Sequence, residues 1–237
     1  MNYIRGIKLQ NAPKSPAYPF GLPVVKYLAD VDALEFHKPV TFFIGENGSG
    51  KSTVLEAIAV AMGLNAEGGS RDFSFSTRDT HSELCDYITL IKSSTPQDSF
   101  FLRAESFYNA ASYIDDNTSL KRYGGVSFHE QSHGESFLSL ASNRFAGNGV
   151  YLLDEPEAAL SPQRLMSLLV IINELVGRGS QFIISTHSPI LMAYPDAEIL
   201  QFSESGIEKT EYTDTEHYRI TKQFIDSPER MMKYLFE

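Results

Sequence analysis

Residues 45–53, GENGSGKST, decide the fold because they fit the pattern G-x-x-x-x-G-K-[ST] in the context that the pattern needs. A short apolar run rich in β-branched and aromatic residues, 39–45, precedes them and predicts a buried strand. Residues 53–64 contain good helix formers and predict a helix that ends near Gly63. A glycine-rich turn is the simpler alternative, but the order of strand, loop and helix favours a phosphate-binding loop.

Each part of this loop has a physical role in holding a nucleoside triphosphate such as ATP. The glycines allow the backbone to wrap around the phosphates with its N–H groups pointing inward, and the positive end of the following helix points at the same anion. Lys51 is expected to reach the β- and γ-phosphates, and Ser52 to bind Mg²⁺. The predicted nucleotide-binding residues are Gly45, Glu46, Asn47, Gly48, Ser49, Gly50, Lys51, Ser52 and Thr53.

Two adjacent carboxylates end a second apolar run, residues 149–154. Asp154 is expected to bind Mg²⁺ directly or through water, and Glu155 to polarise the attacking water as a general base. The alternative is an acidic strand end that caps the following helix. The presence of Lys51 and Ser52 upstream favours the catalytic interpretation.

A histidine follows a third apolar run, in residues 182–189, FIISTHSP. His187 would lie at the edge of the sheet where the phosphate site is expected, close enough to contact the γ-phosphate or the attacking water. A lone histidine is more often structural or simply exposed. Its position after a core strand favours a catalytic role together with Glu155 and Lys51.

Residues 132–136, SHGES, predict the start of a helix rather than a hydrolytic site. His133 is the immediate neighbour of Ser132 and is poorly placed to act as its base. Ser132 and Glu135 have the spacing of a capping box, and a capped helix start with Gly134 is an anion receptor.

The composition limits the kinds of protein that the chain can be. The 237 residues are 42% hydrophobic and carry a net charge of −10, which is typical of a folded globular protein with no general affinity for polyanions. The apolar runs are far shorter than the roughly 18 residues of a membrane span. The single Cys85 excludes an intramolecular disulfide and fits a reducing compartment. We therefore expect a cytoplasmic protein with no membrane partner. Nucleic acid remains possible as a ligand, but the negative net charge gives no support for it.

Apolar strands that alternate with helices predict an α/β fold with a mainly parallel core sheet and a small antiparallel portion. We expect further strands at 3–9, 24–31, 180–186 and 197–203, and an antiparallel pair formed by 86–92 and 99–104. Helices are expected at 105–114, 135–146, 162–179, 215–226 and 228–236, and loops at 65–83 and 115–131.

The set of motifs in this order resembles the ABC-type ATPases, which are P-loop NTPases. GENGSGKST is similar to their Walker A motif, YLLDEP at 151–156 to Walker B, and His187 to their switch histidine. Residues 132–135 lie where that family has its Leu-Ser-Gly-Gly-Gln signature, with Ser132 and Gly134 matching the pattern. DEPEAALSP and STHSP are more similar to the SMC-, RecF- and OLD-like ATPases, and the whole chain resembles small stand-alone bacterial ATPases classed as AAA or ABC type.

The resemblance implies a single ATPase domain over 1–237, with an inserted subdomain of strands and helices at about 65–146 that carries the signature-like loop. It implies an ATP hydrolase that forms a head-to-tail homodimer around ATP and Mg²⁺, in which Ser132, His133, Gly134 and Glu135 contact the nucleotide of the other copy. It also implies a metal- or water-contacting residue near the end of 99–104, for which we favour Glu105; the alternative is a glutamate at a helix start. The aromatic residue that stacks on adenine is open between Tyr18, Phe20 and Tyr27.

Two other functions remain open. The chain could be a nucleotide-sensing module that controls a separate effector protein with little turnover, since no effector segment is recognised in its sequence. A transporter ATPase subunit is less favoured, because residues 154–162, DEPEAALSP, differ from the transporter pattern and no ordinary Q-loop glutamine is found.

Overall fold

The computed structural model describes residues 2–70, 82–117 and 125–237. Its centre is a six-stranded sheet in the order β5-β6-β7-β3-β8-β9. The first five strands of that order run parallel, and β9 pairs antiparallel with β8. The expected mainly parallel α/β sheet is confirmed. The bounds are β3 (Val40–Gly45), β5 (Asp98–Arg103), β6 (Gly149–Asp154), β7 (Gln181–Ser185), β8 (Glu198–Ser203) and β9 (Gly206–Thr210).

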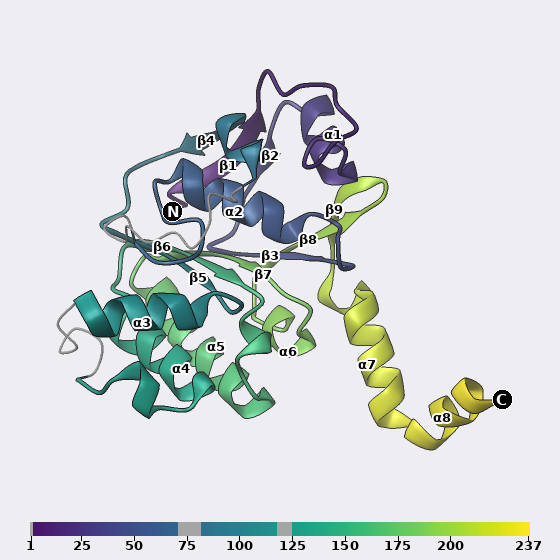
Figure 1. The fold of residues 1–237 in the computed structure, drawn as a ribbon. Helices are drawn as coiled ribbons and strands as arrows, with labels where there is room; N and C mark the ends of the chain where they lie inside the picture. The colour runs from purple at the N-terminus through teal and green to yellow at the C-terminus, as the bar shows by residue number, and fades with distance from the viewer. Residues whose placement is uncertain (1, 71–81, 118–124) are drawn as a thin grey trace.

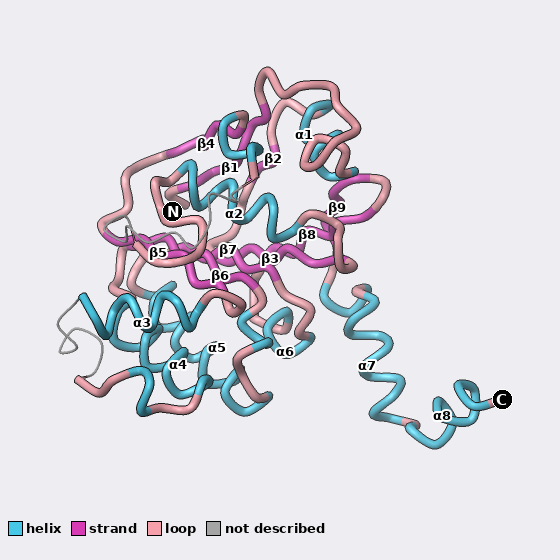
Figure 2. The backbone as a smooth tube through the Cα atoms, in the orientation of Figure 1, coloured by secondary structure: helices cyan, strands magenta, loops and turns pink. Residues whose placement is uncertain are grey.

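Both faces of the sheet are covered, and this explains why its strands are continuously apolar. In Figures 1 and 2, α2 (Lys51–Ala61) lies on one face, and α3 (Phe107–Asn117), α4 (His133–Arg144), α5 (Pro162–Gly177) and α6 (Pro189–Met192) lie on the other. Successive β3 side chains serve opposite cores: Phe42 packs towards α5 and Phe43 towards α2. Because side chains alternate along a strand, a slip of one residue would exchange the two cores, so the register is strongly specified.

A three-stranded antiparallel sheet covers α2 from outside. Its order is β2-β1-β4, with β1 at Ile4–Leu9, β2 at Leu34–Glu35 and β4 at Ile88–Lys92. The expected pairing of 86–92 with 99–104 is therefore wrong, because β4 pairs with β1 whereas β5 pairs parallel with β6. Pairing β5 with β6 buries Phe100, Phe101 and Leu102 on both faces of the central sheet, which a hairpin with β4 would leave half covered.

The strand expected at 24–31 is also wrong, because this segment is α1 (Pro23–Asp30). The buried residues Val24, Val25 and Leu28 have the spacing of one helix face. Pro23 occupies the first helical turn, where its missing N–H is not needed. The expected loops at 65–83 and 115–131 lie partly outside the described residues, at 71–81 and 118–124.

The chain ends in two helices, α7 (Glu216–Asp226) and α8 (Pro228–Phe236), as expected from the sequence. Figure 1 shows both helices extending away from the body of the molecule, and neither contains a buried residue. Among the described residues, the body of the molecule contacts α7 at its start, where the preceding Thr215 is fully buried. Within the described residues, no helix combines the length and the apolar character that crossing a membrane requires.

Candidate functional site

The carboxyl ends of β3, β6 and β7 bring the sequence-predicted residues together at one edge of the sheet. Asp154, the last residue of β6, is paired in register with Ser185 of β7. The backbone N–H of Thr186 donates to the carbonyl of Phe43 in β3, at 3.1 Å. The loop after β3, the carboxylates after β6 and the histidine after β7 therefore start from neighbouring positions, as ligand sites in parallel sheets do.

The loop of residues 45–53 has a backbone that requires glycine. Gly45 and Gly50 have φ angles of 137° and 95°, and a Cβ atom at Gly45 would lie 2.2 Å from the carbonyl oxygen of Phe202. Lys51 is buried, and its ammonium donates to the carbonyls of Gly45 at 2.7 Å and Glu46 at 3.0 Å. An ammonium has three donors, so Lys51 retains one for a phosphate while it holds the loop in shape.

Ser52 and Asp154 form a hydrogen-bonded pair of oxygen-bearing side chains. The Ser52 hydroxyl donates to Oδ1 of Asp154 at 2.9 Å. Burial raises the pKa of Asp154, although Arg103 and the bond from Ser52 oppose the rise. Mg²⁺ prefers oxygen ligands and usually takes only one or two protein groups in addition to phosphates and water. A hydroxyl beside a buried carboxylate fits that requirement.

Arg103 is a member of this site that the sequence did not identify. Its Nε lies 3.3 Å from Oδ2 of Asp154, and its Nη1 donates to Glu56 of α2 at 2.8 Å. All three side chains are largely buried, so this is an internal ion-pair network. The available signal was the position of Arg103 at the end of β5, directly across from Asp154 in register. That position becomes visible only when β5 is known to pair with β6.

Glu155 and His187 face each other beside this pair. Glu155 has a left-handed backbone conformation, with φ at 48°, and its N–H donates to the Ser185 carbonyl at 3.0 Å. Such a conformation is uncommon in residues other than glycine and is often found at functional sites. Oε1 of Glu155 lies 3.8 Å from Nε2 of His187. The two side chains are about one third exposed overall, although Nε2 of His187 is itself a buried atom.

Glu157 fixes the loop that carries His187. Its carboxylate accepts hydrogen bonds from the hydroxyl of Thr186, at 2.8 Å, and from the backbone N–H of His187. Burial raises the pKa of Glu157, and these hydrogen bonds oppose the rise. The Glu-x-Glu spacing of residues 155 and 157 therefore places one carboxylate in the site and the other behind it.

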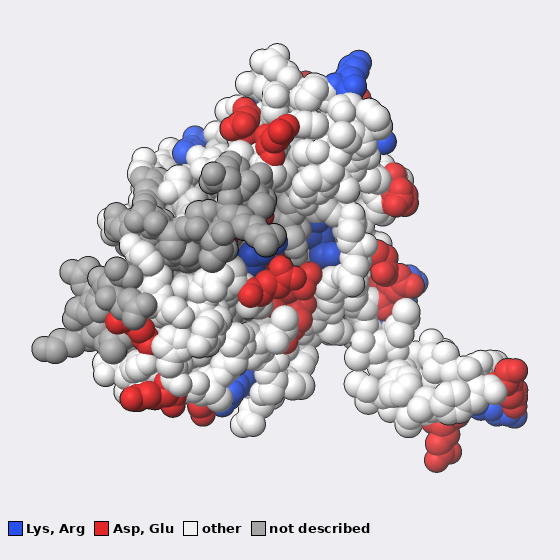
Figure 3. Space-filling view, viewed as in Figure 1, with Lys and Arg blue, Asp and Glu red and all other residues white. Residues whose placement is uncertain are grey.

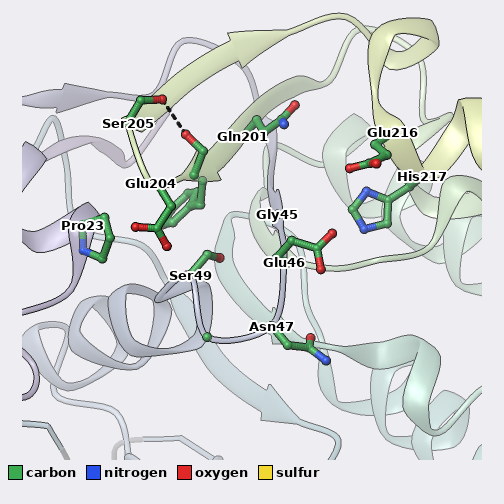
Figure 4. A pocket seen from close by; sticks show the side chains of 13 residues that line it. Pro23, Gly45, Glu46, Asn47, Ser49, Gln201, Glu204, Ser205, Glu216 and His217 are labelled. Atoms are coloured by element: carbon green, nitrogen blue, oxygen red, sulfur yellow. Dashed lines mark hydrogen bonds between the residues drawn. The ribbon is translucent and has the colours of Figure 1, made fainter.

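A second residue that the sequence did not identify is His217, from the first turn of α7. Its Nε2 lies 3.0 Å from Nδ1 of His187. In Figure 4, His217 and Glu216 face Glu46 across a cavity of about 500 Å³. The cavity borders the phosphate-binding loop, but its walls carry three carboxylates, which repel phosphate. Lys51, Ser52 and Asp154 are not among its lining residues in the described chain, so we place the phosphates beside those three groups instead.

The signature-like residues form the exposed start of α4. The carboxylate of Glu135 accepts from the backbone N–H of Ser132 at 3.0 Å and completes the expected capping box. Arg164 of α5 links both residues, with 3.2 Å to the Ser132 hydroxyl and 3.0 Å to Glu135. Gly134 is buried beneath the guanidinium, and a Cβ atom there would lie 2.6 Å from Nη1. The exposed His133 also packs edge-on against Phe107 of its own chain, with ring centroids 5.3 Å apart.

Glu105 and the three aromatic candidates have distinct surroundings. Glu105 is highly exposed and forms an ion pair with Arg103 at 3.9 Å, on the side of Arg103 that faces solvent rather than as part of the Ser52–Asp154 contact. Phe20 is buried against Tyr87, and Tyr27 packs against Gly206. Tyr18 is 66% exposed, and its hydroxyl lies 3.2 Å from that of Thr53. Of the three, Tyr18 alone combines an exposed ring with a contact to the phosphate-binding loop.

The charge distribution agrees with the acidic composition. On the face drawn in Figure 3, the described lysine and arginine side chains are scattered, and acidic side chains gather beside a basic group near the centre. A nucleic-acid backbone is usually bound by clustered basic residues. This face therefore offers no such cluster among the described residues.

Two family models match the sequence. One, described as "AAA domain", matches residues 24–134, which include the phosphate-binding loop. The other, described as "AAA domain, putative AbiEii toxin, Type IV TA system", matches residues 117–193, which include Asp154, Glu155 and His187. Among curated proteins, none matches the chain.

Solved structures are similar in fold. The chain matches cbiO1 of Clostridium perfringens, part of the ABC transporter complex cbiONQ, with 17% identity, a TM-score of 0.53 and coverage of 98% of this chain and 100% of that one. It also matches the SMC head domain from Thermotoga maritima, with 18% identity, a TM-score of 0.43 and coverage of 76% and 93%. At such identities the first likeness concerns the fold alone.

Proposed function

We propose that this chain, a P-loop ATPase of the ABC and SMC-like type, hydrolyses ATP with Mg²⁺ in composite sites shared by two copies of itself. The observation that carries the proposal is the buried contact between Ser52 and Asp154, with Lys51 on one side and Glu155 and His187 on the other. No other described part of the chain gathers a phosphate-binding loop, a metal-ligand pair and a general base.

The nucleotide would be held mainly by the loop of residues 45–53. The loop N–H groups and the start of α2 would bind the phosphates, and Lys51 would donate to the γ-phosphate from its buried position. Ser52 and Asp154 would hold Mg²⁺, which neutralises charge on the β- and γ-phosphates when it is bound. Tyr18 is the proposed platform for the base, because its ring is exposed beside Thr53.

Hydrolysis would depend on Glu155 and His187. The Glu155 carboxylate would accept a proton from the water that attacks the γ-phosphorus, and the bond from that phosphorus to the β–γ bridging oxygen would break. His187 would donate a hydrogen bond from Nε2 to the γ-phosphate oxygens as they gain charge. Its Nε2 is a buried atom without a hydrogen-bond partner in the described chain, and it faces Glu155 at 3.8 Å.

The second copy would supply the start of α4. Ser132, His133 and Glu135 are exposed and Gly134 lies beneath Arg164, so this helix start is available to a neighbouring molecule. A capped N-terminus with its positive dipole end is suited to an anion. ATP held by one copy would thus be enclosed by the other, and hydrolysis would release the pair.

The test is Glu155→Gln, which preserves shape and removes the general base. We expect steady-state phosphate release to fall by about 100-fold or more, the typical contribution of such a group. Light scattering of this variant with ATP and Mg²⁺ should show a dimer that the ATP-free protein does not form. A variant that binds ATP and stays monomeric at high concentration would refute the shared site.

A second candidate is the nucleotide-sensing module that controls a separate effector. The observation in its favour is the match of residues 117–193 to the family model whose description includes a toxin of a type IV TA system. In that case ATP binding would change the state of the chain with negligible turnover. Fast phosphate release that disappears in Glu155→Gln would argue against it.

A further inference from the structure

The contact between His187 and His217 joins two elements whose residues lie 30 positions apart in the chain. His187 follows β7, whereas His217 is the second residue of α7, at the base of the extended C-terminal helices. Their facing nitrogens, Nδ1 of His187 and Nε2 of His217, are 3.0 Å apart, and their ring centroids are 5.2 Å apart. Since both are ring nitrogens, one has to donate and the other has to accept.

The surroundings of His187 determine the direction of that hydrogen bond. Its other nitrogen, Nε2, lies 3.8 Å from a carboxylate oxygen of Glu155. A carboxylate only accepts hydrogen bonds. The lone pair of an unprotonated Nε2 would be repelled by the carboxylate of Glu155, whereas an N–H group at Nε2 would be attracted to it. The favoured form of His187 therefore carries its proton on Nε2. Its Nδ1 is then the acceptor, and His217 is the donor.

This arrangement requires both rings to be neutral, and the direction of the pKa shift of each ring favours that form. Burial lowers the pKa of His187, and Lys51 and His217 lower it further, against the opposing effect of Glu155 and Glu46. Burial also lowers the pKa of His217, while Glu46 and Glu216 oppose the change.

The position of His217 is fixed by the start of its helix. The hydroxyl of Thr215 donates to the carbonyl of Tyr212 at 2.8 Å and accepts from the backbone N–H of Tyr218 at 3.2 Å. Thr215 is fully buried, and the rings of Tyr212 and Tyr218 pack 4.7 Å apart. The first turn of α7 is therefore anchored, and it presents His217 to His187 in one place.

We propose that His217 is a positioning residue of the hydrolytic site: it donates to Nδ1 of His187 and thereby fixes the proton of His187 on Nε2, towards Glu155 and the γ-phosphate. This inference rests on the proposed function, because His187 has to act on the nucleotide for its tautomer to matter. It assigns a role in the reaction to the C-terminal helix α7.

The direct test is ¹⁵N NMR of the imidazole groups in the nucleotide-free protein at neutral pH. We expect His187 to be protonated on Nε2 and its Nδ1 to show the shift of a hydrogen-bond acceptor. In His217→Leu that shift should be lost, and in His217→Gln, whose amide is still a donor, most of it should remain. A proton on Nδ1 of His187 in the unchanged protein, or an Nδ1 signal that does not respond to His217→Leu, overturns the proposal.

Kinetics give the second readout. We expect His217→Leu to lower kcat roughly tenfold or more, by analogy with residues that orient metal-bound histidines through a hydrogen bond, with little change in KM for ATP. His217→Gln should retain most of kcat, and the exposed His37→Leu should match the unchanged protein. An equal loss in the Leu and Gln variants contradicts the positioning role. Failure of the proposed function appears differently, as a Glu155→Gln variant that still hydrolyses ATP while the NMR result for His187 holds.

Discussion

The hydroxyl of Ser52 lies 2.9 Å from Oδ1 of Asp154, although 102 residues separate the two in the chain. The contact exists because β3 and β6 both pair with β7, so the first turn of α2 begins beside the end of β6. A hydroxyl and a carboxylate from two different elements are thereby brought to one place, which is what the proposed Mg²⁺ site requires of them.

The first prediction concerns this pair. Asp154→Asn should lower ATP hydrolysis by about 100-fold or more, because metal-based charge stabilisation is worth several kcal/mol. ATP titrations of the unchanged protein should differ between Mg²⁺ and EDTA, and titrations of the variant should not. Asp196→Asn is the control, since Asp196 is highly exposed and pairs only weakly with Lys38. If ATP binding by the Asp154→Asn variant still responds to Mg²⁺, Asp154 is not a ligand of the metal.

The second prediction concerns Arg103. Arg103→Met leaves the buried carboxylates of Asp154 and Glu56 without their cation, and the loss of one member of a buried ion pair typically costs about 3–5 kcal/mol. We expect a loss of this size in the free energy of unfolding, measured by urea titration. Lys222→Met breaks the exposed pair with Asp226 and should leave the free energy of unfolding nearly unchanged. Equal effects of the two substitutions would show that the Arg103 network adds little.

The third prediction is the pH dependence of stability that comes from His187 and His217. Their pKa values are lowered in the folded chain from an ordinary value of 6.5, first by burial. As the pH falls through 6.5, these two histidines therefore bind more protons in the unfolded chain than in the folded chain. The free energy of unfolding that they contribute above this pH is lost below it. The double variant His187→Gln/His217→Gln should lose less stability than the unchanged protein between pH 7.5 and 5.5, as followed by urea unfolding. A parallel loss in both proteins would mean that neither histidine carries this dependence.

The sequence was sufficient to predict the positions of the site residues that lie at or after the ends of apolar strands. Lys51, Ser52, Asp154 and His187 each follow a run that is buried on both sides, and parallel strands bring their carboxyl ends to one edge. Their positions could therefore be inferred from strand order along the chain. The strand register that places Asp154 beside Ser185 came from the structure.

Arg103 and His217 could not be inferred in this way. The role of Arg103 depends on the pairing of β5 with β6, and residues 99–104 are equally suited to a hairpin with the preceding strand. His217 lies in a polar helix with no buried residue, and the direction of that helix is set by Thr215, Tyr212 and the body of the molecule. Local patterns contain no information on such long-range contacts.

The fourth prediction concerns Tyr18. Stacking of a base on an aromatic ring is worth about 1–3 kcal/mol, so Tyr18→Ala should weaken ATP binding by several-fold to about a hundredfold. Tyr18→Phe keeps the ring and should bind ATP nearly as the unchanged protein does, since only the contact with Thr53 is lost. Tyr108→Ala removes a similarly exposed ring from α3 and is the matched control. Isothermal titration calorimetry with ATP measures the affinity of each variant. An unchanged affinity in Tyr18→Ala would show that the base does not stack on this ring.

The last prediction concerns the start of α4. A Cβ atom at Gly134 would lie 2.6 Å from Nη1 of Arg164 and 3.0 Å from the carbonyl oxygen of Ala159, so Gly134→Ala has to displace the guanidinium. That guanidinium contacts both Ser132 and Glu135, so its displacement changes the arrangement of the exposed helix start.

If this helix start contacts the nucleotide of a second copy, displacing Arg164 should weaken the association of the two copies. In the Glu155→Gln background, Gly134→Ala should weaken ATP-driven dimerisation by about 10- to 100-fold and leave ATP binding to the monomer unchanged. Light scattering over a concentration series, with ATP titrations beside it, measures both quantities. Gly177→Ala is the control, because a Cβ atom there meets no other atom within 4 Å. If the variant with Gly134→Ala dimerises as strongly as Glu155→Gln alone, the start of α4 does not contact the nucleotide of the second copy.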